Sequence, residues 1–336
     1  MNDLVIGLLS AVLATNQPAA ISNLVRQKTG LALNVPDKND PVEKEFHKLL
    51  DADDAAQAEV DKWITERPKT EAENGGIEKA AIRARIKQRF DPVREGYEDF
   101  LKRHPAHARA HLAYGSFLND IHDEDAALAH WEKARELDPK NPAAWNNLAN
   151  YYGHNGQVTN SFVYYAKAIE LEPDEPVYYQ NLATTLYMFR QDAMAFFKIE
   201  EPVVFDRAMA LYRQALALDP ENFLLASELA QSYYGIKLPK LADAQAAQRL
   251  HAAALAAWEN ALKLARDDVE REGVQVHLAR VSINAGNYDT ARLHLGLVTN
   301  AMFNVTKTRM LKNLLVKEGK STNAPAPPSE LNLEKK

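Results

Sequence analysis

The sequence predicts an all-α protein built from stacked pairs of helices, and three observations lead to that prediction. Pro105, Pro139 and Pro173 follow one another at intervals of 34 residues, each after a segment that reads as the end of a helix. Apolar residues between these prolines recur at i, i+3 and i+7, the spacing of one buried helical face. Small residues recur where the two helices of each unit would cross. Self-similarity at a fixed period of this length indicates a repeat architecture.

The prolines mark joints between successive units. A proline biases the residue before it away from the helical region, so Asp138 and Glu172 should each leave a helix. The Asn-Pro pair at 141–142 and the Glu-Pro pair at 175–176 should then start the next helix, because proline is pre-set for the first helical turn. Packed helices lie about 8–10 Å apart, which leaves room only for small side chains at a close crossing. The candidates for these crossings are Gly115, Ala127, Ala134, Ala149, Ser161 and Ala168.

This pattern resembles the tetratricopeptide repeat (TPR), a helix-turn-helix unit of 34 residues. The best unit matches at Trp145, Leu148, Ala149, Tyr152, Gly156, Ser161, Tyr165, Ala168 and Pro173. We expect about five such units over residues 108–299. The resemblance implies a right-handed α-α superhelix, a TPR solenoid, whose common activity is the binding of other proteins.

Two departures from the period predict insertions. Pro173 and Pro220 lie 47 residues apart, which leaves thirteen extra residues that we place near 190–204, between the two helices of one unit. The following unit carries a similar excess near 237–250. Because both insertions fall at the same turn, we expect them to emerge on the same edge of the stack.

The flanking segments differ from the repeats in composition. We expect a helical region at 1–66, a polar linker at 67–79, a partial repeat at 80–107, a C-terminal capping helix at 300–319 and a disordered tail at 320–336. A capping helix is expected because repeat arrays need a polar outer face on their last unit.

The N-terminal segment from Leu4 to Ala14 is nearly all apolar and has no Lys or Arg before it. Its eleven residues are too few to span a bilayer as a helix. A buried or self-associating helix, an export signal and a membrane-surface contact all remain open. We therefore expect a cytoplasmic protein with a possible homo-oligomer contact through residues 1–30. The alternative is a protein exported or membrane-associated through residues 1–20.

Composition argues against several classes of function. The chain of 336 residues has a net charge of -6, and such a charge gives no general basic field for nucleic acid. It has no cysteine, and thus no disulfide, thiolate metal ligand or cysteine nucleophile. We find no phosphate-binding glycine loop, no His-Glu-x-x-His and no Gly-x-Ser-x-Gly. We expect no enzymatic activity, no cofactor and no metal.

A binding groove is the main functional candidate, because the resemblance implies that the first helix of each unit lines the concave side. The predicted peptide-binding residues are Asn146, Asn147, Asn150, Gln180, Asn181, Thr184, Tyr187, Gln231, Tyr234 and Arg280. Asn147 and Asn181 lie one repeat apart and should form a ladder of amides, and a side-chain amide can both donate to and accept from a peptide backbone. The alternative is that these amides merely solvate an exposed helix face.

Relatives that grip the carboxyl terminus of chaperones use Lys and Arg at such positions. Here Ala143, Asn146, Val177 and Gln180 occupy them. We do not expect a carboxylate-clamp chaperone ligand, since the groove is neutral and polar.

Three histidines, His104, His107 and His111, are spaced by three and four residues. Imidazoles one helical turn apart can share a metal ion. However, Pro105 should push His104 out of the helix, and His111 falls at a core position. We expect one packing histidine and two surface histidines.

The sequence therefore predicts a non-enzymatic interaction scaffold that binds an extended peptide segment in its concave groove. The alternative is a self-assembling or envelope-associated structural protein held by the apolar N-terminal helix.

Overall fold

The computed structural model describes residues 40–65, 75–236 and 244–319, and within these ranges every regular element is helical. The chain divides into two compact units, Met1–Lys140 and Asn141–Lys336, which are described separately. The predictions for the apolar segment from Leu4 to Ala14 and for the tail at 320–336 lie outside the described residues.

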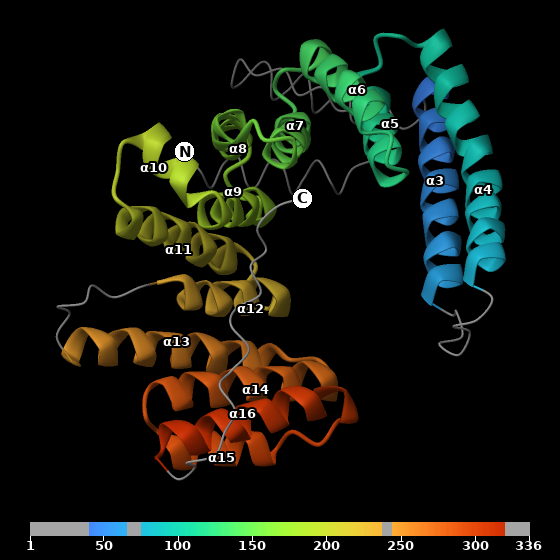
Figure 1. Ribbon diagram of the computed structural model, residues 1–336. Helices are drawn as coiled ribbons and strands as arrows, with labels where there is room; N and C mark the ends of the chain where they lie inside the picture. Colours follow the sequence, from blue (N-terminus) through green and yellow to red (C-terminus); the bar gives the residue numbers. More distant parts are fainter. Residues whose placement is uncertain (1–39, 66–74, 237–243, 320–336) are drawn as a thin grey trace, which may run out of the picture. The chain divides into compact units, whose positions relative to one another are not determined.

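The first unit contains α3 (Pro41–Thr65), α4 (Gly75–Arg103), α5 (Ala108–Asp120) and α6 (Glu124–Leu137). Asp40 caps α3, since the Val42 amide donates to its Oδ1 at 2.8 Å. Helices α3 and α4 lie side by side (Figure 1). Between them the Tyr97 hydroxyl donates to Asp53 Oδ2 at 2.8 Å. The buried rings of Phe46 and Phe100 also meet between these helices, with centroids 5.8 Å apart, so this part of the core is aromatic.

Helix α4 begins at Gly75, inside the range that we expected to be a linker, and continues through Pro92 to Arg103. Residues Val93, Tyr97 and Phe100 of α4 are buried. These residues are the apolar face of the segment that we expected to be a partial repeat.

The second unit consists of four consecutive helix pairs in its described residues. They are α7 (Pro142–His154) with α8 (Val158–Leu171), α9 (Pro176–Met188) with α11 (Glu201–Leu218), α12 (Phe223–Ser232) with α13 (Ala244–Leu264), and α14 (Asp268–Asn284) with α15 (Tyr288–Gly296). Helices α5 and α6 of the first unit form a pair of the same kind. The predicted all-α TPR-type stack is confirmed, and Figure 1 shows its successive pairs.

The joints between pairs have the predicted local structure. Asp138 and Glu172 leave the helix with φ of -136° and -142°. Asn141 caps α7 by accepting from Ala143 N at 3.0 Å, and Glu175 caps α9 by accepting from Val177 N at 3.2 Å. In both helices proline occupies the first turn. The joint sequence therefore acts as a stop followed by a start.

The helices of each pair cross at the small residues. Gly115, Ala127, Ala149, Ser161 and Ala168 are buried at these crossings. A Cβ added at Gly115 would lie 2.6 Å from the Trp131 ring, so the close approach of α5 and α6 requires glycine.

The first predicted insertion forms ordered structure. Helix α10 (Arg190–Phe197) follows α9 directly and ends at Lys198, which has a left-handed φ of 54°. Residues 198–200 connect α10 to α11, and the first turn of α11 completes the predicted range. Of the second insertion, residues 237–243 lie outside the described residues, and 244–250 form the start of α13.

The C-terminal end of the second unit carries η2 (Ala301–Phe303) and α16 (Asn304–Lys317). Leu314 of α16 is buried in a cluster with Ile283 of α14 and Ala291 of α15. Helix α16 therefore covers the apolar face that the last pair would otherwise expose, in the position expected for a cap.

Candidate functional site

The predicted peptide-binding residues lie on the first helices of the pairs in the second unit. We call this surface the first-helix face, meaning the side of α7, α9, α12, η1 (Tyr233–Gly235) and α14 that carries them. One residue per helix occupies equivalent positions along it: Asn147, Asn181, Glu228 and His277. All four are partly buried. The face therefore presents a row of polar side chains at the repeat spacing.

Neighbouring first helices are joined by two hydrogen bonds, which we call the diagonal pairs. Asn181 Nδ2 donates to Asn146 Oδ1 at 2.9 Å, and Gln180 Nε2 donates to Glu228 Oε2 at 2.9 Å. The expected ladder of Asn147 with Asn181 is thus displaced by one residue. Asn147 contacts Asn146 of its own helix, with Asn146 Nδ2 donating to Asn147 Oδ1 at 3.4 Å. Both diagonal pairs thus join non-equivalent positions of neighbouring first helices.

Two of the predicted residues serve the interior of their own pairs. The Tyr165 hydroxyl of α8 donates to Asn150 Oδ1 at 2.5 Å, and Thr184 Oγ1 lies 2.8 Å from the Tyr212 hydroxyl of α11. Burial raises the pKa of Tyr165 to about 12, so its hydroxyl stays protonated and remains a donor. Asn150 and Thr184 therefore anchor the tyrosine of the second helix.

An aromatic cluster ends the first-helix face. The rings of Trp258 and His277 stack with centroids 4.1 Å apart and planes 8° apart. The Tyr234 hydroxyl lies 3.1 Å from His277 Nδ1, and the Arg280 guanidinium lies 5.1 Å from the centre of the Tyr234 ring. Burial, followed by the charge of Arg280, lowers the pKa of His277 to about 4. Trp258 is itself buried, so the partly exposed Tyr234 and His277 form the accessible side of this cluster, beside the exposed Arg280.

The remaining two predicted residues, Tyr187 and Gln231, differ in how much their surroundings constrain them. The Tyr187 ring packs against Phe205 with centroids 5.7 Å apart. A Cβ added at Gly235 would lie only 2.6 Å from the Tyr187 hydroxyl. The close approach of η1 to Tyr187 therefore depends on glycine at position 235. Gln231 is exposed on α12. Tyr187 is therefore held in place, whereas Gln231 is a solvated side chain.

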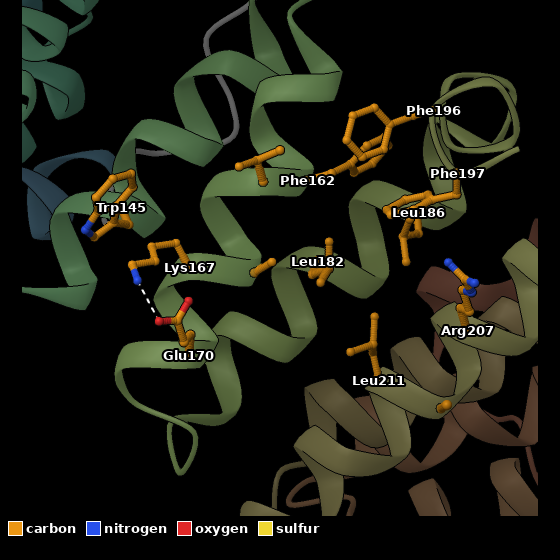
Figure 2. A pocket seen from close by; sticks show the side chains of 13 residues that line it. Trp145, Phe162, Lys167, Glu170, Leu182, Leu186, Phe196, Phe197, Arg207 and Leu211 are labelled. Carbon is orange, nitrogen blue, oxygen red and sulfur yellow. Dashed lines mark hydrogen bonds and ion pairs between the residues drawn. The ribbon is translucent and has the colours of Figure 1, made fainter. Parts of the chain in front are cut away.

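A pocket of about 790 Å³ lies on the opposite helices of the same unit (Figure 2). We call it the α10 pocket, because the inserted helix α10 supplies part of its wall. Its main apolar lining comes from Phe162, Leu182, Leu186, Phe196, Phe197 and Leu211. Phe196 and Val163 are 41% and 50% exposed. The insertion therefore adds an open apolar surface to the stack.

The α10 pocket is not predicted by the repeat pattern, although the insertion that builds it is. One signal was present. Two adjacent aromatic residues, Phe196 and Phe197, stand in a segment outside the repeat period, where no repeat core requires them. Val163 is a second sign, as an apolar residue on the outer side of a second helix.

Comparison with known proteins supports this description of the fold. A family model of the tetratricopeptide repeat matches residues 130–160. The C-terminal part of a TPR repeat-containing protein from Cytophaga hutchinsonii is 12% identical, with a TM-score of 0.51, covering 81% of this chain and 99% of that chain. PilF of Pseudomonas aeruginosa is 13% identical, with a TM-score of 0.50, covering 79% and 98%. The chain therefore carries a tetratricopeptide repeat at residues 130–160 and shares the fold of these proteins.

A third structure, YrrB, described as a TPR protein with an unusual peptide-binding site, is 14% identical, with a TM-score of 0.48, covering 67% of this chain and 99% of that chain. No curated protein matches the sequence. At these identities the likeness concerns the fold alone, and the partner of this chain has to be argued from its own residues.

The histidines of the first unit have separate partners. His107 caps α5 by accepting from Ala110 N at 3.0 Å, and its Nε2 lies 3.3 Å from Glu43. His111 Nε2 contacts the Pro105 carbonyl, which can only accept, so His111 Nδ1 accepts from His130 Nδ1 at 2.9 Å. His107 is therefore partly buried and paired, not the surface histidine that we expected.

Within the residues that the structure describes, no group of three histidine or acidic side chains is placed to hold a metal ion. None of the described helices combines the length and the apolar character that crossing a membrane requires.

Proposed function

We propose that this protein is a non-enzymatic scaffold whose second unit binds an extended segment of another protein along the first-helix face. The observation that supports this most is the row of one partly buried polar residue per first helix, from Asn147 to His277. An extended peptide presents donors and acceptors at regular intervals, so a ligand that follows the row meets a polar group at each repeat.

The diagonal pairs leave hydrogen-bonding capacity on this row. An amide side chain carries two donor hydrogens and one acceptor oxygen, and Asn181 uses one of its donors in its diagonal pair. The Glu228 carboxylate accepts from Gln180 through one oxygen. These internal bonds hold the side chains in one orientation, which lowers the entropy lost when a ligand binds.

The charges of the face indicate the ligand's character. Glu228 is acidic, Arg280 is basic, and the side chains between the amides are neutral. We therefore expect a segment recognised mainly through its backbone, with Tyr234 and His277 contacting one of its side chains. Aromatic residues of this kind commonly anchor interfaces.

The test replaces two amides of the row by carboxylates, Asn147→Asp together with Asn181→Asp. Each change removes both donor hydrogens, so ligand carbonyls lose their partners, while Asn146 can rotate its amide to donate to residue 181. We expect capture of the cellular partner in a quantitative pull-down read by mass spectrometry to fall at least about tenfold, equivalent to ~1.4 kcal/mol.

The matched control is Asn160→Asp with Gln214→Glu, two exposed residues on second helices that receive the same change of charge. It should leave capture unchanged. Both double variants should keep the helical content of the parent by circular dichroism. Equal capture by the parent and the Asn147→Asp, Asn181→Asp variant would refute binding on this face.

A further inference from the structure

The α10 pocket is separate from the first-helix face. Its walls are the second helices α8 and α11 together with α10, and its floor is formed by Leu182 and Leu186 of α9. Figure 2 shows Phe196 and Phe197 at one wall and Leu211 opposite them. The two aromatic side chains pack against Phe162, with ring centroids 5.7 and 5.5 Å apart. The wall is therefore a packed aromatic cluster that leaves one side open.

The size and lining of the pocket suit a large apolar side chain. Ligand pockets in proteins have volumes of about 300–1,000 Å³ and are mostly apolar with few polar groups. The volume of about 790 Å³ falls in this range. Two exposed alanines, Ala166 of α8 and Ala210 of α11, line the pocket and keep its mouth wide.

Three charged side chains line the pocket: Lys167, Glu170 and Arg207. Lys167 Nζ lies 2.6 Å from Glu170 Oε1, so these two charges compensate each other. Arg207 has no ion pair among the described residues, and its guanidinium lies 5.2 Å from the centre of the Phe197 ring. The mouth therefore carries one uncompensated positive charge next to an apolar wall, and a carboxylate is its complement.

We propose that the α10 pocket binds a second kind of partner segment, in which a bulky apolar side chain lies close to an aspartate or glutamate side chain. The apolar side chain enters between α8 and α11, and the carboxylate pairs with Arg207. Trp145 and Arg207 lie at opposite ends of the lining (Figure 2), so the segment runs along the pocket between them. We assign this carboxylate to an internal acidic side chain, and a peptide with a blocked carboxyl terminus tests that assignment.

The probe is a phage-displayed library of random twelve-residue peptides, selected on the full-length protein. We expect enriched sequences that combine Leu, Ile, Met or Phe with Asp or Glu. An enriched peptide is then synthesised with blocked ends, and its affinity is measured by fluorescence anisotropy. Blocking both ends removes the terminal charges, so any remaining dependence on Arg207 comes from the acidic side chain.

Two pairs of variants locate the binding. Ala210→Trp fills the pocket from an exposed position and should weaken the peptide at least tenfold, whereas Ala217→Trp, two turns later on α11 and outside the lining, should not. Arg207→Glu should weaken it about tenfold, and a peptide with Lys in place of its acidic residue should recover the loss. Arg249→Glu, an exposed charge on α13, is the matched control.

Several outcomes overturn the proposal. It fails if no peptide is enriched, if Ala210→Trp and Ala217→Trp act alike, or if the charge swap with Arg207→Glu gives no recovery. It also fails if the enriched peptides are lost only in the Asn147→Asp, Asn181→Asp variant, since they would then occupy the first-helix face. A concentration-dependent dimer in sedimentation that Ala210→Trp dissociates would assign the pocket to a second copy of this chain instead.

Discussion

Single residues at the turns within pairs set how tightly the chain reverses. Gly156, between α7 and α8, has a φ of 77°, and a Cβ built there would meet nothing within 4 Å. The corresponding turn between α5 and α6 contains His122, with a φ of 63°. The left-handed conformation is costly for any residue with a Cβ, so the turn at Gly156 is unstrained and the turn at His122 carries backbone strain.

We therefore predict that Gly156→Ala lowers the free energy of unfolding by about 1–2 kcal/mol, because the only penalty is backbone strain. His122→Gly should change it by less than about 0.5 kcal/mol, since relief of strain offsets the greater freedom of the unfolded chain. Urea denaturation measures both. An equal loss in the two variants would contradict this explanation.

His277 provides a prediction about pH. Its folded-state pKa of about 4 lies below the unfolded value of 6.5, so between these values the unfolded chain binds the extra proton. Stability should therefore fall as pH falls from 6.5 to 4, with no further loss from this group below pH 4. His277→Gln should make the free energy of unfolding less dependent on pH in this window.

The measurement compares unfolding free energies at several values between pH 4 and 7.5. His154→Gln, at an exposed position of α7, is the control. The His277→Gln variant loses the stack on Trp258 and should be less stable at neutral pH. Only its slope with pH is diagnostic, and a slope equal to the parent's would refute the assignment.

At the residue scale, sequence predicted which side chains lie on the first helices but not how they pair. Asn147 and Asn181 are equivalent in the repeat, so a ladder between them was the natural expectation. The bond from Asn181 to Asn146 depends on how two neighbouring helices pack, which is a tertiary property. A periodic pattern specifies equivalent positions and carries no information on that packing.

At the element scale, the crossing of α5 and α6 depends on one glycine. We predict that Gly115→Ala costs about 1–3 kcal/mol, because the new Cβ would lie 2.6 Å from the buried Trp131 ring and 3.1 Å from the Ala127 carbonyl oxygen. Gly153→Ala is the matched control, since its Cβ would make an ordinary contact of 3.7 Å with Ser161. It should be neutral or stabilising by up to about 1 kcal/mol through helix propensity.

Thermal and urea denaturation of these two variants separate packing from propensity. If both glycine replacements stabilise the protein, the close approach at Gly115 is not a constraint.

Helices and their joints were predictable because their signals are local. A proline after a helix end and a capping side chain act within a few residues. The sequence predicted too late a start for α4, because Gly75 and Gly76 are typical of a linker. Packing of α4 against α3 overrides this local preference. The α10 pocket was not predicted because its lining residues come from several helices. No local sequence pattern shows that these residues lie close together in the fold.

At the scale of the whole molecule, the two proposed binding surfaces use mainly different helices of the stack. The first-helix face draws on α7, α9, α12 and α14, and the α10 pocket draws mainly on α8, α10 and α11. Helix α9 contributes to both, with Asn181 on the face and Leu182 on the pocket floor. Residues without shared partners usually act additively.

We predict that the Asn147→Asp, Asn181→Asp variant binds the α10-pocket peptide with parent affinity, and that Ala210→Trp captures the face ligand as the parent does. Combining the three changes should give the sum of the separate losses within about 0.5 kcal/mol. The anisotropy and pull-down measurements described above test this. A larger deviation would mean that α9 transmits a change between the two surfaces.

The diagonal pairs also bear on how the stack deforms. Each joins a residue of one first helix to the next helix one position along, so sliding of the two helices past each other would stretch it. At the following junction, Ser227 Oγ has no hydrogen-bond partner among the described residues, and His277 bonds Tyr234 instead. Because Tyr234 lies in η1, directly after α12, this contact also ties α12 to α14. Sliding any first helix of the row past the next would therefore break a hydrogen bond, and we expect the row to resist shear along its whole length.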